Sequence, residues 1–99
     1  MRLQVHSLKF DADKKLTDFI QKKTDKLHTF FDKITAGEVF MRLDTGEKAD
    51  NKVIEIKLAV PGAILFAKQQ ASSFEAATER AVEALRTQLL KHKEKLAIH

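Results

Sequence analysis

The sequence has 99 residues and carries 18 Lys and Arg against 14 Asp and Glu, a formal net charge of +4 at pH 7. This length predicts one small domain over residues 1–99, and 43% hydrophobic with 32% charged residues is typical of a folded chain. The absence of Cys excludes disulfides, thiolate catalysis and Cys-ligated metal sites. No apolar run is long enough to span a bilayer or to serve as a secretory signal, so we expect a cytoplasmic protein.

The first third of the chain predicts a strand followed by a helix. Residues 3 to 6 alternate between apolar and polar side chains, which indicates a short strand. Asp13 is the expected N-cap of a helix over residues 14 to 34, where apolar side chains recur with a helical period. The members of this apolar face are Leu16, Phe19, Ile20, Leu27, Phe30, Phe31 and Ile34.

The middle of the chain predicts three more strands. They are expected at residues 39 to 43, 53 to 60 and 63 to 68, and the last two are joined by a tight turn at Pro61-Gly62. The polar residues 44 to 52 predict a loop or a long hairpin turn.

A second long helix closes the chain. The segment Ser72-Ser73-Phe74-Glu75 matches a capping box, in which a Ser hydroxyl accepts from the N3 amide and Glu75 reaches back. The helix is expected to run to about Leu96, with acidic residues early and basic residues late, an order that complements the helix dipole. The resulting order β-α-β-β-β-α predicts an α+β fold, a four-stranded, mostly antiparallel sheet with both long helices packed on one face.

Basic residues of the first helix fall on one line. Lys15, Lys22, Lys26 and Lys33 share a narrow stripe, which could follow a nucleic-acid backbone or could be a solvated face with acidic partners one turn away. Lys23 instead lies on the apolar face, where its stem can pack while its amine reaches the helix edge, or where it can point at a phosphate.

The last helix ends in a second basic cluster. From Arg86 to the end of the chain there are four basic residues, Arg86, Lys91, Lys93 and Lys95, and one acidic residue. Dipole complementation and solubility offer a simpler explanation for this tail. Neighbouring helices lie about 8–10 Å apart, however, so two basic helices can merge into one positive surface.

Other kinds of site have weaker signals. The four histidines lack a metal-binding spacing, His92 is expected to pack on the inner helix face, and the three glycines form no phosphate loop. Phe30 and Phe31 are expected in the core, and Phe40 is expected to be exposed on the sheet, without the aromatic motif that stacks RNA bases. We therefore expect neither catalysis nor a cofactor.

The chain resembles the short ribosome hibernation-promoting factors, the ribosome-associated inhibitor family of bacteria. The resemblance spans nearly the whole length and includes Lys23-Thr24-Asp25-Lys26-Leu27 and Phe30-Phe31-Asp32-Lys33-Ile34. It is strongest from Gln88 to Leu96, which is similar to the family's closing Gln-Leu-x-Lys-His-Lys-x-Lys-Leu.

The resemblance implies a double-stranded-RNA-binding-domain-like fold and a ribosomal function. Members bind the small ribosomal subunit, with its 16S rRNA, between head and body, where they block mRNA and tRNA at the decoding centre in stress or stationary phase. By position, Lys23, Lys26 and Lys33 match basic positions of the family's first helix, and Lys91, Lys93 and Lys95 match those of the last. Lys22 and Arg86 are basic here without a firm family match, and complete the expected rRNA-binding set: Lys22, Lys23, Lys26, Lys33, Arg86, Lys91, Lys93 and Lys95.

The sequence also departs from the family pattern. A Tyr common at the start of the last helix is missing from Ser73-Phe74-Glu75-Ala76-Ala77-Thr78-Glu79, and the usual Arg before the Gln-Leu pair is Thr87. The chain stops near His99, so we expect no C-terminal dimerisation domain. We also expect a monomer off the ribosome, with no membrane partner and no small-molecule substrate. Two alternatives stay open, a protein-interaction module that uses its sheet and a double-stranded-RNA binder that acts away from ribosomes.

Overall fold

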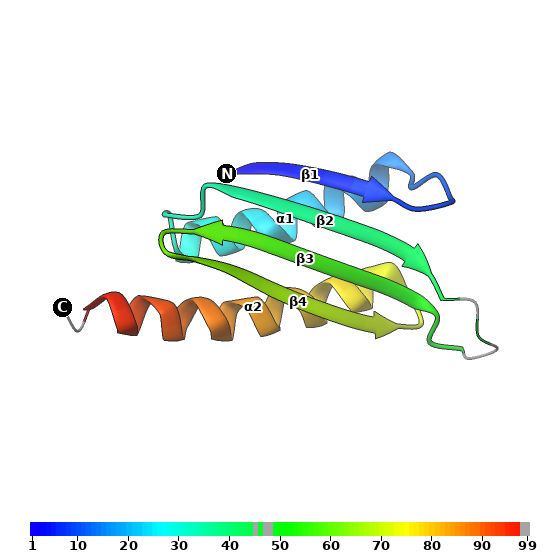
Figure 1. The fold of residues 1–99 in the computed structure, drawn as a ribbon. Coiled ribbons are helices and arrows are strands. Elements are labelled where there is room, and N and C mark those ends of the chain that lie inside the picture. Colours follow the sequence, from blue (N-terminus) through cyan, green and yellow to red (C-terminus); the bar gives the residue numbers. More distant parts are fainter. Residues whose placement is uncertain (45, 47–48, 98–99) are drawn as a thin grey trace.

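The protein folds as a sheet backed by two helices. The structure, a computed structural model, describes residues 1–44, 46 and 49–97. Its elements follow the predicted order (Figure 1): β1 Arg2–Ser7, α1 Lys14–Phe30, β2 Ala36–Leu43, β3 Lys52–Val60, β4 Ala63–Ala71 and α2 Phe74–Ala97. All four predicted strands are present, and each is longer than the alternating pattern indicated. The predicted loop between β2 and β3 includes residues 45, 47 and 48, which lie outside the described residues.

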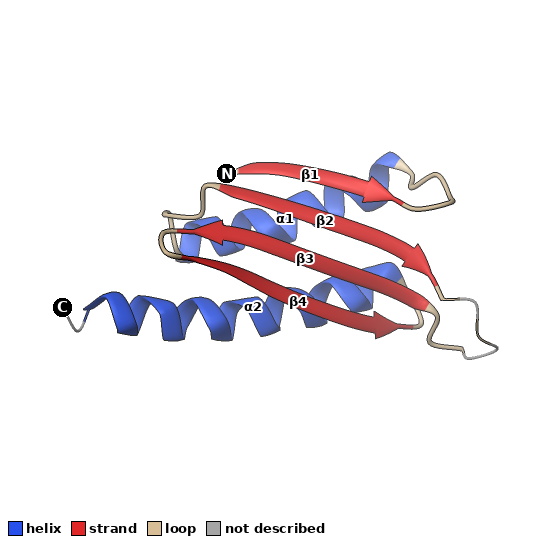
Figure 2. Ribbon diagram, viewed as in Figure 1, coloured by secondary structure: helices blue, strands red, loops and turns tan. Residues whose placement is uncertain are grey.

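The strands form one sheet in the order β1-β2-β3-β4. Strand β1 pairs with β2 in parallel, and the other two pairings are antiparallel. Both helices cover the same face of this sheet (Figure 2). The predicted α+β architecture, with a mostly antiparallel sheet and two helices on one face, is therefore confirmed.

The core lies between the sheet and the helices. Strand β3 supplies Ile54, Ile56 and Leu58, all fully buried, because alternate side chains of a strand point to the same face. Helix α1 supplies Ile20 and α2 supplies Leu85, which are also fully buried. The turn before β4 contains Gly62 with φ +79°, a left-handed conformation that favours glycine, as the Pro61-Gly62 pair predicted.

The first helix is shorter than its apolar pattern predicted. It ends at Phe30 rather than near Ile34, and Phe31 adopts an extended backbone with φ −142°. The amide of Phe31 still donates to the Leu27 carbonyl at 2.8 Å, which closes the last turn. Phe31 and Ile34 are nevertheless buried, because the segment that leads into β2 keeps packing against the core. One consequence is that Lys33 lies outside the helix, so the predicted helical stripe is wrong at that residue.

The helix starts are capped by side chains. The Asp13 carboxylate accepts from the Leu16 amide at 2.8 Å, as predicted. Helix α2 is capped by Ser73, whose hydroxyl accepts from the Ala76 amide at 3.0 Å. This cap puts Ala76 at the third helical position, so the reciprocal bond predicted from Glu75 is absent from the part of the chain that the structure describes.

Strand β4 lies at the margin of the sheet and is shielded by α2. The Gln88 side chain donates to the Phe66 carbonyl at 2.9 Å, and the Arg80 guanidinium donates to the Gln70 carbonyl at 3.0 Å. Unpaired carbonyls on an outer strand are a template for pairing with another chain. These two side chains therefore oppose association through β4.

The packing of α2 predicts unequal costs for two leucines. Leu85→Ala leaves a cavity in the core and is expected to lower the free energy of unfolding by about 3 kcal/mol. Leu90→Ala, on the same helix but 47% exposed, is the control and is expected to cost less than about 1 kcal/mol. Urea denaturation of both variants checks this, and equal destabilisation would contradict the position of α2.

The shielding of β4 predicts increased self-association when it is removed. The double variant Arg80→Ala with Gln88→Ala exposes two carbonyls and is expected to form more dimers or larger species than the wild type at equal concentration. Sedimentation velocity measures the difference. Glu83→Ala, on the same helix, is the control, and an unchanged distribution in the double variant would refute the shielding.

Candidate nucleic-acid interface

The two helices meet along a groove that we call the helix seam. The helix seam has a volume of about 320 Å³. It is lined by residues of both helices: Lys23, Lys26, Leu27, Phe30, Glu79, Val82, Glu83 and Arg86. The seam therefore brings Lys23 and Lys26 of α1 beside Arg86 of α2, which are three members of the predicted rRNA-binding set. It also contains two carboxylates, Glu79 and Glu83, which reduce its positive charge.

Lys23 is paired with a carboxylate on the other helix. Its ammonium lies 3.2 Å from the Glu79 carboxylate, and 5.4 Å from the centre of the Phe19 ring. The side chain is only 25% exposed. This geometry agrees with a packed stem whose amine reaches the edge of the helix, and it makes Lys23 less available to a phosphate than its neighbours.

Phe30 holds two cations of α2 near α1. The Arg86 guanidinium lies 5.1 Å from the centre of the Phe30 ring, and the Lys93 ammonium lies 4.7 Å from it. Lys93 also donates to the Phe30 carbonyl at 3.4 Å. The electron-rich face of an aromatic ring attracts cations, so Phe30 places both charges at the junction of the helices.

The sequence predicts Phe30 in the core, and the structure shows it half-buried, packed against the core and beneath these two cations. The contact of the Phe30 ring with Arg86 and Lys93 was not predicted from the sequence. The available signal was the Phe30-Phe31 pair, because adjacent helical residues point about 100° apart and both cannot face the core equally. Phe31 is the buried one, with 6% exposure.

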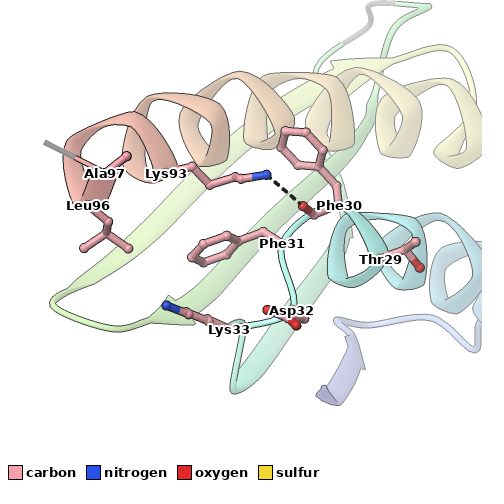
Figure 3. A pocket seen from close by; sticks show the side chains of 8 residues that line it. All are labelled: Thr29, Phe30, Phe31, Asp32, Lys33, Lys93, Leu96 and Ala97. Carbon is pink, nitrogen blue, oxygen red and sulfur yellow. Dashed lines mark hydrogen bonds between the residues drawn. The ribbon is translucent and has the colours of Figure 1, made fainter.

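A second groove, which we call the end groove, lies where α1 has ended. It is formed by residues 29–33 and by Lys93, Leu96 and Ala97 of α2, with a volume of about 450 Å³. Figure 3 shows Lys33 and Lys93 on either side of the Phe31 ring. The chain reversal after α1 thus brings Lys33 opposite α2, although it removes Lys33 from the helical stripe.

The remaining predicted residues are exposed on other parts of the helices. Lys22, Lys91 and Lys95 are all open to solvent. Successive residues of a helix turn by about 100°, so Lys91 and Lys95 share one side of α2 while Lys93 lies on the other. The structure therefore gathers Lys26, Lys33, Arg86 and Lys93 at the seam and the end groove, and leaves the two other tail lysines on the outer side of α2.

His92 packs on the inner side of α2, as predicted. Its ring meets Phe31 edge-on at 5.8 Å between ring centres. Its Nε2 atom is buried without a hydrogen-bond partner among the described residues. Those residues also contain no group of three or more His, Asp or Glu that could hold a metal ion.

The opposite face of the sheet carries paired charges. The His6 ring lies 3.0 Å from the Glu38 carboxylate, and Arg42 forms an ion pair with Glu55. Phe40 is partly exposed there, stacked on His6 at 4.9 Å between ring centres. His6 and Arg42 are thus matched by nearby carboxylates, whereas Arg2, Lys57 and Lys68 on the same face have no ion pair among the described residues. Within the described residues, no helix is both long and apolar enough to cross a membrane.

Comparison with known proteins identifies relatives over almost the whole chain. The ribosome hibernation promoting factor of Azotobacter vinelandii is 35% identical over 95 residues, which cover 96% of this chain and 85% of that protein. The ribosome hibernation promoting factor of Klebsiella oxytoca is 28% identical over 99 residues and is covered completely.

Solved structures share the fold. A ribosomal subunit interface protein from Coxiella burnetii superposes with a TM-score of 0.84 at 19% identity, covering 95% of this chain and 99% of that one. The N-terminal domain of Protein Y from Thermus thermophilus gives a TM-score of 0.79 at 22% identity, covering 93% and 99%. The family model described as "Sigma 54 modulation protein / S30EA ribosomal protein" matches residues 3–97. By this match and these relatives, the chain belongs to the Sigma 54 modulation protein / S30EA ribosomal protein family.

Proposed function

We propose that this protein is a ribosome hibernation factor that binds the small ribosomal subunit and keeps mRNA and tRNA out of the decoding centre. Its family and its relatives named ribosome hibernation promoting factors support this function. Those names give no support to a sheet-based interaction module or to a duplex binder that acts away from ribosomes. In this proposal the protein works in the cytoplasm during stress or stationary phase, as a monomer off the ribosome, and needs no cofactor.

One observation of the structure carries the proposed RNA contact. Lys26, Arg86, Lys33 and Lys93 come from three separate segments and converge where α1 ends against α2. Within the described residues, none of the four forms an ion pair with a carboxylate. Cations without an internal partner can neutralise phosphates and release the counterions that surround RNA, which favours binding.

The mechanism combines electrostatic attraction with exclusion. The basic residues would hold the helix side of the protein against rRNA phosphates. The folded body, with extents of 48 × 24 × 17 Å, would then occupy space that a message and the anticodon end of tRNA require. Lys22, Lys91 and Lys95 would extend the contact on the outer sides of the helices, and Lys23 would support the seam through Glu79.

Charge reversal distinguishes the helix side from the sheet side. The triple variant Lys91→Glu, Lys93→Glu and Lys95→Glu is expected to lower affinity for isolated small subunits on the order of 100-fold at moderate salt, because three phosphate contacts become repulsive. Co-sedimentation over a series of salt concentrations measures both the affinity and its salt dependence.

The matched control changes the same number of charges on the open sheet face. Arg2→Glu with Lys57→Glu and Lys68→Glu alters the net charge equally and is expected to weaken binding far less. Retained binding by the tail variant would refute the role of the tail. Loss confined to the sheet variant would favour the interaction-module alternative, and equal binding of a plain RNA duplex and of the subunit would favour the duplex binder.

The carboxylates of the seam predict a gain in affinity. Glu79→Gln with Glu83→Gln removes two negative charges beside Lys26 and Arg86 and frees Lys23, so binding to small subunits is expected to tighten on the order of threefold or more. Asp50→Asn, at the far hairpin, is the control and is expected to leave affinity unchanged. Weaker binding by the seam variant, with unchanged thermal stability, would show that the seam does not face RNA.

A further inference from the structure

The end groove has features that phosphate binding alone does not explain. Its two lysines lie beside apolar groups, namely the Phe31 ring and the side chain of Leu96 (Figure 3). Leu96 is 40% exposed and gives the groove an apolar surface next to its cations. A duplex backbone offers phosphates and sugars to a protein surface but would leave this apolar wall without a matching partner.

We propose that the end groove receives one unpaired nucleotide of RNA, with its base against the exposed side chain of Leu96 and its flanking phosphates bound by Lys33 and Lys93, one on either side of the Phe31 ring. This inference rests on the proposed function and names the part of the RNA that this end of the interface recognises. Unpaired nucleotides of RNA can be splayed out of the stack, and proteins bind them through apolar or aromatic contacts to the base.

The size and charge of the groove fit this ligand. The groove has a volume of about 450 Å³ and is wide open to solvent, so a nucleotide at the surface of an RNA can reach it. Lys33 comes from the segment after α1 and Lys93 from α2, on either side of the Phe31 ring (Figure 3), and neither has a carboxylate partner among the described residues. Lys93 is already oriented by the Phe30 carbonyl at 3.4 Å and by the Phe30 ring, so little side-chain freedom is lost when it meets a phosphate.

The helix seam is a poorer candidate for the same ligand. It contains Glu79 and Glu83, and Glu79 already holds Lys23 at 3.2 Å. The single acidic side chain of the end groove is Asp32, which is exposed on the segment after α1. A carboxylate in that position can accept hydrogen bonds from the donor edge of a base while the lysines hold the phosphates.

A tryptophan reporter tests the inference directly, because the sequence contains no Trp and no Tyr. Leu96→Trp puts the only indole in the end groove, and Leu90→Trp puts it on the same helix outside the groove. Single-stranded hexaadenylate and small ribosomal subunits are expected to quench the Leu96→Trp emission by base stacking, and a 12-base-pair RNA duplex is not. Leu90→Trp is expected to change little with any of the three.

Affinity measurements complete the test. Leu96→Ala is expected to weaken subunit binding about fivefold, while Leu90→Ala leaves it unchanged. Lys33→Gln with Lys93→Gln is expected to reduce the slope of log affinity against log salt by about 1.4, the value for two contacts to a single strand.

The outcomes separate this inference from the proposed function. Two results would overturn the nucleotide site and leave the hibernation function standing. In both, the Leu96→Trp variant sediments normally with subunits, and its emission either is not quenched or is quenched equally by the duplex. Failure of the wild-type protein to sediment with small subunits would overturn the proposed function instead. Quenching by an acidic peptide but not by hexaadenylate would also overturn the nucleotide site.

Discussion

The structure depends on one packing constraint, which is that two amphipathic helices must bury their apolar faces on the same side of one sheet. The fully buried side chains Ile20, Ile56 and Leu85 meet there from α1, β3 and α2. Two helices that share one face must also lie against each other, and their polar sides then form a common outer surface. The positive seam and the end groove are thus consequences of how the core is closed.

The same constraint explains why much of the fold could be predicted from the sequence. In strand β3, the apolar residues Ile54, Ile56 and Leu58 are separated by polar or small residues. This period of two indicates a strand with one buried face. Apolar residues recur with a helical period over both long segments, which indicates helices. Asp13 indicates where the first of them begins. Both signals are local, so they could be read without knowledge of tertiary contacts.

The candidate site was less predictable because it depends on where the chain leaves regular structure. Phe31 and Ile34 continue the helical period of α1, yet the backbone has already become extended, so the pattern alone put Lys33 on the wrong element. The pairing of Lys23 with Glu79 joins residues far apart in the chain, and no local pattern indicates it. The sequence showed which segments carry an excess of basic residues. Only the packing of the helices showed which of these residues share a groove.

The parallel pairing of β1 gives the sheet an uneven resistance to local opening. Strands β2, β3 and β4 follow one another in the chain and pair with their immediate neighbours. Strand β1 has a single neighbour and joins it across the α1 crossover, with Arg2 aligned to Ala36. Detaching β1 breaks one row of hydrogen bonds and leaves the other three strands and α2 in place. This margin can therefore fray while Lys33, in the segment after α1, and Lys93, on α2, keep their arrangement.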